Sequence, residues 1–179
     1  PENVVTYIID RNINYTNVCV ADCKFCAFYR RPKHAEGYLL SFEEIGRKID
    51  ELKALGGVQI LMQGGHNPYI PFAWYLDLLR YIKRHHPIHI HGFSPSEVDF
   101  FAGRFGMSIE DVIKELMAAG LDSIPGGGGE ILAAIHTHVQ RTICHQRESP
   151  LPRTQLITAD TKIGQHAIIL AQRLAQLGG

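Results

Sequence analysis

The chain has 179 residues, of which 45% are hydrophobic and 20% are charged, as expected for a soluble globular protein with a sizeable core. Its 18 basic and 18 acidic residues balance, so the net charge favours neither nucleic-acid binding nor an acidic disordered tail. The sequence contains no signal peptide and no apolar run long enough to cross a bilayer. We therefore expect a cytoplasmic protein without nucleic-acid or membrane partners. Because it begins with Pro1, we interpret the chain as a fragment or a processed form.

Strands and helices are predicted to alternate from the amino terminus onward. A β-branched run over residues 4–9 predicts the first strand. The capping-box pattern that begins at Ser41 and the apolar residues spaced at helical intervals after it predict a helix that ends at Gly56. The short apolar run over residues 58–62 predicts a buried strand.

The same alternation continues through the middle of the chain. Pro71 opens a second predicted helix, which ends before Pro87, and residues 88–91 alternate as a strand. Ser108 caps a third predicted helix, which Gly120 closes, and residues 121–124 form a fourth predicted strand. Alternation of this kind indicates βαβ units and a parallel sheet.

A doubly wound sheet and a (β/α) barrel both fit this pattern. Polar or Gly-rich segments follow the predicted strands at residues 63–68, 94–97 and 125–130. Because barrels assemble their active sites from several βα loops at one face, this placement favours an α/β fold of the partial (β/α) barrel type. Residues 125–130 lack the third glycine of a dinucleotide-binding loop and the Lys-Ser/Thr pair of a P-loop.

After Leu132 the alternation stops, and Pro150 and Pro152 interrupt the sequence. We therefore divide the chain into a (β/α) core over residues 1–132 and a divergent C-terminal segment over residues 133–179. Apolar residues at helical spacing predict a helix over residues 163–177. The barrel is expected to be truncated or incomplete.

Three cysteines stand within eight residues, at Cys19, Cys23 and Cys26, and the fourth, Cys144, lies far away. Structural zinc sites usually take four protein ligands. Three thiolates on one loop suit a [4Fe–4S] cluster with one iron left open. The alternatives are zinc binding, three incidental cysteines, or a disulfide with one spare cysteine.

The spacing Cys19-x3-Cys23-x2-Cys26, with Phe25 before the last cysteine, resembles the signature of the radical S-adenosylmethionine (SAM) superfamily. The resemblance implies that the open iron binds SAM and that one electron cleaves SAM to give a 5′-deoxyadenosyl radical. It also implies a reducing partner such as flavodoxin or ferredoxin.

Five further segments resemble cyclic dehypoxanthinyl futalosine synthases of menaquinone biosynthesis. They span residues 11–17, 26–30, 61–68, 91–97 and 119–128, and the resemblance extends over residues 7–132. It implies a radical SAM oxidoreductase that converts dehypoxanthine futalosine to its cyclic form. Sister enzymes of the aminofutalosine synthase or F0 synthase type, or a cluster-binding but inactive fragment, are the alternatives.

The same resemblance assigns roles to individual residues. It implies that Phe25, Tyr29, Gly64, Gly65, Ser94 and Glu97 contact SAM, and that His66 contacts the substrate. From the residues alone, Gly64-Gly65 could be a plain turn, and Ser94 with Glu97 could be a helix cap. His89 and His91 are predicted to share one face of their strand, which in a barrel could point inward. No catalytic residue is assigned.

Overall fold

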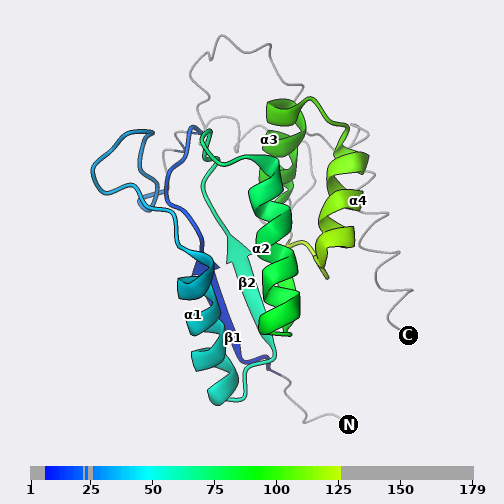
Figure 1. Cartoon of the computed structure of the whole chain (residues 1–179). Helices are drawn as coiled ribbons and strands as arrows, with labels where there is room; N and C mark the ends of the chain where they lie inside the picture. The colour runs from blue at the N-terminus through cyan, green and yellow to red at the C-terminus, as the bar shows by residue number, and fades with distance from the viewer. Residues whose placement is uncertain (1–6, 22, 24–25, 126–179) are drawn as a thin grey trace, which may run out of the picture.

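The computed structural model describes residues 7–21, 23 and 26–125, and Figure 1 shows the path of the chain. Within these residues, the strands β1 (Asp10–Asn14), β2 (Gln59–Gln63) and β3 (His89–Gly92) form a parallel sheet in the order β1-β2-β3. The helix α1 (Phe42–Ala54) connects β1 to β2, and α2 (Phe72–His85) connects β2 to β3. The helices α3 (Pro95–Phe105) and α4 (Ile109–Ala119) follow β3. These residues therefore form an α/β fold with a parallel sheet, as the sequence predicts.

The two faces of the sheet differ in character. Ile13 lies opposite Met62, and Ile60 lies opposite Ile90; each of these side chains is at most 1% exposed and belongs to the hydrophobic core shared with the helices. The other face carries the alternate residues of the strands, among them Asn12, Asn14, Leu61, Gln63 and His91, which are half-buried or exposed. This second face is therefore mostly polar.

The helix ends follow the signals in the sequence. At the start of α1, Ser41 Oγ accepts a hydrogen bond from the Glu44 backbone N–H, and Glu44 Oε2 accepts one from the Ser41 N–H. Gly56 and Gly120 have φ values of 80° and 117°, which glycine adopts without strain, and they follow the ends of α1 and α4.

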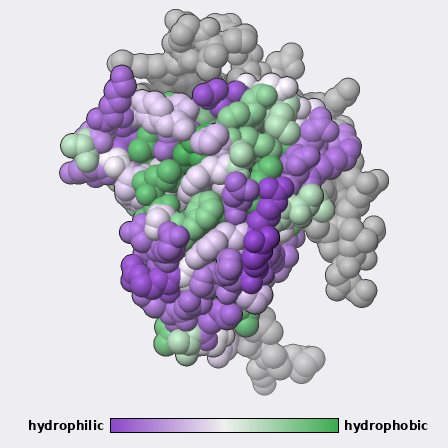
Figure 2. Space-filling model, viewed as in Figure 1, coloured by the Kyte–Doolittle hydropathy of each residue, from purple (hydrophilic) through white to green (hydrophobic). Residues whose placement is uncertain are grey.

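Figure 2 shows mostly hydrophilic residues on the lower half of the visible surface, over the region of α1 in Figure 1.

Three expectations about the elements need correction. The first strand lies at Asp10–Asn14 instead of residues 4–9; Tyr7 and Ile8 are 82% and 61% exposed, and residues 4–6 lie outside the described part. The fourth strand is reduced to a single parallel bridge between His91 and Ser123. The helix α3 (Pro95–Phe105) occupies a region for which the sequence predicted a polar segment after the strand and, at most, a helix cap at Ser94.

The C-terminal expectations lie outside the described residues. These are the Gly-rich loop from Gly126 onward, the divergent segment over 133–179 and the helix over 163–177. Among the helices that are described, none is both long enough and apolar enough to cross a membrane.

Candidate functional site

The segments that follow β1 and β2 run side by side at the carboxyl end of the sheet. The Tyr15 N–H donates to the Gln63 carbonyl at 3.3 Å, and the Gly65 N–H donates to the Thr16 carbonyl at 3.0 Å. The Val20 N–H then donates to the His66 carbonyl at 3.1 Å. This continued pairing places the first cysteine, Cys19, beside the Gly64-Gly65-His66 segment.

The loop that carries the cysteines is closed by hydrogen bonds between its two ends. The Cys19 N–H donates to the Arg30 carbonyl at 2.9 Å, and the Arg30 N–H donates to the Asn17 carbonyl at 2.7 Å. The buried Asn17 side chain donates to the Glu36 carbonyl at 2.9 Å and accepts from the Tyr38 N–H at 2.8 Å. The base of the loop is therefore held by backbone pairing and by one buried amide.

All three predicted cysteine ligands are half-buried, and none of them forms a disulfide. Cys19 Sγ accepts hydrogen bonds from the Ala21 N–H at 3.4 Å and the His66 N–H at 3.3 Å. Burial raises the pKa of the Cys19 thiol, and these two N–H donors oppose that shift. Over the described ranges, no three Cys, His, Asp or Glu side chains converge to hold a metal ion, so the three-cysteine ligand set stays a prediction.

Gly64 and Gly65 are packed too closely for any side chain. A Cβ atom on Gly64 would lie 2.3 Å from the Tyr15 ring, and one on Gly65 would lie 2.3 Å from the Val18 carbonyl oxygen and 2.9 Å from Cys19 Cβ. These glycines therefore let the backbone after β2 lie directly against the start of the cysteine loop. A plain surface turn would not require such close packing.

Ser94 and Glu97 form the capping box that begins α3, with Pro95 in the first turn. The Glu97 carboxylate is 1% exposed and accepts hydrogen bonds from the Tyr15 hydroxyl, the Gly64 N–H, and the N–H and hydroxyl of Ser94. The helix-cap interpretation of this pair is confirmed. Burial raises the pKa of the Glu97 carboxyl, and the hydrogen-bond donors around it oppose that shift.

His66, the predicted substrate contact, lies in the same loop cluster. Its imidazole stacks on the Phe100 ring of α3, with centroids 4.9 Å apart and planes inclined by 10°. Burial lowers the pKa of His66 to about 4, so its ring is neutral at physiological pH. The structure therefore brings Cys19, Gly64, Gly65, His66 and Glu97 together at one end of the sheet.

The two predicted aromatic contacts remain untested. Phe25 lies outside the described residues. Tyr29 is half-buried on the returning arm of the cysteine loop, where its carbonyl accepts a hydrogen bond from the Arg30 guanidinium at 3.0 Å.

His89 and His91 both lie on the polar face of the sheet, as the sequence predicts. Their ring nitrogens lie 2.9 and 2.7 Å, respectively, from Ser123 Oγ. Burial lowers the pKa of His91, which favours its neutral form. The hydroxyl of Ser123 thus fixes both rings at the position of the single bridge after α4.

Sequence reasoning missed Tyr15, Thr16 and Asn17. All three are buried between β1 and the first cysteine. The Tyr15 side chain donates to the Glu97 carboxylate, and those of Thr16 and Asn17 donate to the carbonyls of Tyr38 and Glu36 at the base of the loop. The signal available in the sequence was a short run of hydrogen-bonding side chains between a strand and a cysteine cluster. That pattern alone does not reveal which distant backbone groups these side chains meet.

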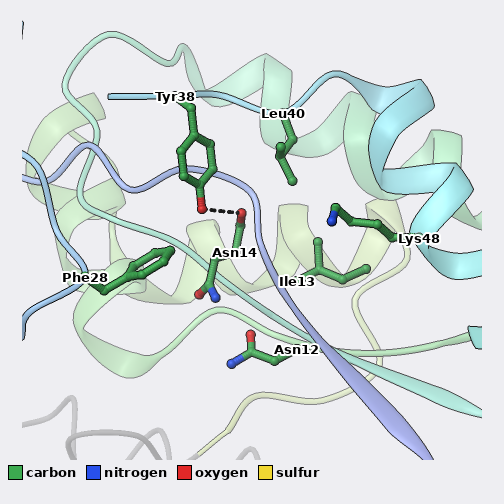
Figure 3. Close-up of a pocket in the computed structure, with 7 residues that line it drawn as sticks. All are labelled: Asn12, Ile13, Asn14, Phe28, Tyr38, Leu40 and Lys48. Atoms are coloured by element: carbon green, nitrogen blue, oxygen red, sulfur yellow. Dashed lines mark hydrogen bonds between the residues drawn. The ribbon is translucent and has the colours of Figure 1, made fainter. Parts of the chain in front are cut away.

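A separate pocket of about 290 Å³ lies at the free edge of β1 (Figure 3). It is lined by Asn12, Ile13, Asn14, Phe28, Tyr38, Leu40 and Lys48. The Tyr38 hydroxyl donates to the Asn14 carbonyl at 3.2 Å across this pocket. None of the lining residues is a cysteine or belongs to the glycine segment, so the pocket is distinct from the loop cluster described above.

Comparison with known proteins gives a family match over most of the chain. The model of the radical SAM superfamily matches residues 13–172. Cyclic dehypoxanthine futalosine synthase of Halalkalibacterium halodurans is 55% identical over 133 residues, which cover 74% of this chain and 36% of that protein. FO synthase of Nocardia farcinica is 46% identical over 129 residues, covering 72% of this chain and 15% of that protein.

Two further proteins complete the comparison. A 5-amino-6-(D-ribitylamino)uracil–L-tyrosine 4-hydroxyphenyl transferase of Methanopyrus kandleri is 43% identical over 141 residues, covering 78% of this chain and 37% of that protein. The solved structure of methylornithine synthase has a TM-score of 0.46 at 16% identity, covering 93% of this chain and 62% of that one. The chain thus spans between 15% and 37% of the length of these three curated relatives.

Radical SAM proteins use a [4Fe–4S] cluster and SAM. The residues present fit those groups, because three cysteines that form no disulfide stand on one loop whose base is fixed by hydrogen bonds. The close approach of Gly65 to Cys19 also places bare backbone beside the first of these thiols.

Proposed function

The chain belongs to the radical SAM superfamily, and on that premise we propose that it acts in converting dehypoxanthine futalosine to cyclic dehypoxanthine futalosine in menaquinone biosynthesis. The observation that carries the proposal is the 55% identity to a cyclic dehypoxanthine futalosine synthase over 133 residues. The two relatives with other names are 43% and 46% identical over segments of similar length.

In this proposal Cys19, Cys23 and Cys26 hold the cluster, and the backbone at Gly64 and Gly65 binds the amino group of SAM. When bound, the cluster and SAM supply a primary carbon radical that can remove a hydrogen atom from an unactivated C–H bond. The chain itself positions the reactants and excludes water from the site.

The residues around the cysteines suit that task. The neutral ring of His66 offers the substrate an aromatic surface and a hydrogen-bonding nitrogen without a positive charge, and its stacking on Phe100 keeps the ring in one orientation. In the proposed cyclisation, the SAM-derived radical would take one hydrogen atom from the ribose. After ring attack, one proton would leave to solvent and one electron would return to the oxidised cluster, so that SAM would be the net oxidant. The product is therefore lighter than the substrate by two hydrogen atoms.

A sister reaction is the second candidate, because FO synthase and the tyrosine 4-hydroxyphenyl transferase match the same core. Under that alternative, the aromatic reactant would be tyrosine and the acceptor a ribityl-substituted uracil, as in the name of the Methanopyrus relative. The cluster and SAM would be shared between the two proposals, and only the substrate would differ.

The test is a direct product assay. The anaerobically reconstituted protein would be incubated with SAM, a chemical reductant and either dehypoxanthine futalosine or the tyrosine–uracil pair, and the products would be separated by mass spectrometry. We expect 5′-deoxyadenosine together with a product two hydrogen atoms lighter than dehypoxanthine futalosine. Turnover of only the tyrosine–uracil pair would support the sister enzyme instead.

The assay also addresses an inactive cluster-binding chain. Such a chain would bind iron and sulfide but form no 5′-deoxyadenosine above the level of a Cys23→Ser variant. Replacing the chemical reductant with a ferredoxin or a flavodoxin then tests the proposed electron donor.

A further inference from the structure

We propose that Glu97 is a positioning residue of the cofactor site, which fixes the Gly64-Gly65 backbone through a hydrogen bond and does not itself contact SAM. This inference rests on the proposed use of Gly64 and Gly65 in binding SAM. It differs from the expectation that Glu97 touches the cofactor directly.

The hydrogen bonds of the carboxylate carry the argument. Glu97 Oε1 accepts from the Tyr15 hydroxyl at 2.7 Å and from the Gly64 N–H at 3.0 Å. Glu97 Oε2 accepts from the Ser94 N–H at 2.7 Å and from the Ser94 hydroxyl at 2.9 Å. Each oxygen therefore has two donors within the chain, and the group is 1% exposed. A carboxylate engaged in this way has little capacity left for a ligand.

These bonds join three segments that are distant in the sequence. Tyr15 follows β1, Gly64 follows β2, and Ser94 caps α3 after β3. Phe93, between β3 and α3, has a φ of 56°, an uncommon conformation for a residue with a side chain. This turn lets Ser94 reach the same carboxylate, so one buried charge holds the carboxyl ends of three adjacent strands in register.

Helix capping alone does not account for this arrangement. The capping box of α1 uses the same residue types, Ser41 and Glu44, but it is exposed to solvent. Burying a carboxylate costs free energy unless other groups compensate for its lost hydration. At Glu97 that compensation includes the contacts with Tyr15 and Gly64, which the exposed cap lacks.

The contact with Gly64 determines which groups the glycine segment can offer to a ligand. The Gly64 N–H is used by Glu97, and the Gly65 N–H is used by the Thr16 carbonyl. With both donors engaged inside the chain, the segment can offer a ligand only its carbonyl oxygens, which suit an ammonium group such as that of SAM. The Gly65 carbonyl already accepts from the Asn67 N–H at 2.8 Å, but a carbonyl oxygen has a second lone pair. Without the bonds to Glu97 and Thr16, the two glycines could rotate and turn their N–H groups, instead of their carbonyl oxygens, toward the ligand.

Hydrogen exchange of the Gly64 amide tests the inference without any cofactor. Relative to the wild type, we expect the Gly64 amide to exchange about tenfold faster or more in Glu97→Ala, because its acceptor is lost. Val98→Ala is the matched control, since it removes buried atoms one residue further along α3 but leaves the carboxylate in place. Equal Gly64 exchange in Glu97→Ala and Val98→Ala, at similar global stability, would overturn the inference.

A milder pair of variants covers the case in which Glu97→Ala does not fold. Glu97→Gln keeps the shape of the side chain but has one acceptor oxygen for two sets of donors, so Gly64 exchange should rise. Glu44→Gln makes the same change in the exposed capping box of α1 and should leave Gly64 unaffected. Matching exchange rates in these two variants would also contradict the proposal.

SAM binding to the reconstituted protein provides the second readout. We expect Glu97→Gln to weaken SAM binding by about tenfold, while iron and sulfide per chain stay at the wild-type level. Weaker SAM binding with unchanged Gly64 exchange would mean that Glu97 contacts SAM directly, and the inference would be wrong. Because neither readout uses dehypoxanthine futalosine, a failure of the proposed cyclisation would leave this result unaffected.

Discussion

At the scale of single residues, Gly65 shows how steric fit and cofactor binding impose the same requirement. Its missing side chain leaves room for the Val18 carbonyl and the Cys19 side chain. The sequence suggested that Gly64 and Gly65 allow a cofactor to approach the backbone. The structure shows that the two glycines also allow the segment after β2 to pack directly against the segment after β1.

We predict that Gly65→Ala destabilises the protein by about 1–3 kcal/mol and reduces cluster incorporation. The new Cβ would lie 2.3 Å from a backbone oxygen, which cannot rotate away, so the start of the cysteine loop must shift. Urea unfolding of the apo protein would measure the stability, and iron and sulfide content after reconstitution would measure the loss of the cluster.

Gly103→Ala is the matched control for that variant. Gly103 lies in α3, and a Cβ there would meet nothing within 4 Å. Because alanine favours a helix interior over glycine by about 0.5–1 kcal/mol, this variant should be slightly more stable with normal cluster content. Equal effects of the two substitutions would show that close packing at Gly65 has no special role.

At this scale the sequence predicted residue types better than contacts. The cysteines, the glycine pair, His66 and Glu97 were all selected from the sequence. Their partners were not, because Tyr15, which follows β1 and bonds to Glu97, stands 82 positions away, and no local pattern encodes such a distance. The capping box beginning at Ser94 was one of two interpretations that the residues alone left open, the other being a contact with the cofactor.

At the scale of elements, the cysteine loop is a closed unit anchored by Asn17. The amide of this side chain bonds both to the Glu36 carbonyl and to the Tyr38 N–H on the returning arm. An isolated parallel bridge between Val18 and Arg30 supports the same closure. The loop that carries the three thiols is therefore positioned by its base.

We predict that Asn17→Ala costs about 1–3 kcal/mol, because the part-buried Tyr38 N–H and Glu36 carbonyl would lose the buried amide that is their partner. The loop should also open more often, so trypsin should cleave faster after Lys33, which is exposed on it. Tyr38→Phe is the control, since it removes one hydroxyl contact at 3.2 Å but keeps the backbone bond to Asn17. Indistinguishable cleavage rates in the two variants would contradict a role for Asn17 in closing the loop.

The elements that the sequence misplaced share a physical cause. The strand β1 has a single buried apolar side chain, Ile13, because its other face is not covered by the helical core, so it lacks the apolar run that usually marks a strand. The apolar residues just before it are exposed instead. By contrast, α1, α2 and α4 were predicted closely, because each buries one apolar stripe and has clear end signals.

At the scale of the whole molecule, a group of described candidate residues lies at the carboxyl end of one parallel sheet, namely Cys19, Gly64, Gly65, His66 and Glu97. This is the place where α/β folds assemble their active sites from loops. In Figure 1 the strands β1 and β2 both point toward the loops that hold the cysteines and the glycine pair. The order of the strands therefore explains why residues from three loops meet, although the sequence alone left a doubly wound sheet open.

The ligand set of the cluster is the prediction that involves the chain as a whole. We expect Cys19→Ser, Cys23→Ser and Cys26→Ser each to abolish the [4Fe–4S] cluster, because a three-thiolate site has no spare ligand. Cys144→Ser, which removes the remaining cysteine of the chain, should leave iron and sulfide at the wild-type level. EPR spectra of the reduced protein, recorded with and without SAM, would then show a [4Fe–4S]⁺ signal that changes on SAM addition only in the wild type and Cys144→Ser. Loss of the cluster in Cys144→Ser would indicate a fourth thiolate ligand and no open iron. Zinc in place of iron in the wild type would contradict the assignment of the three cysteines to an iron–sulfur cluster.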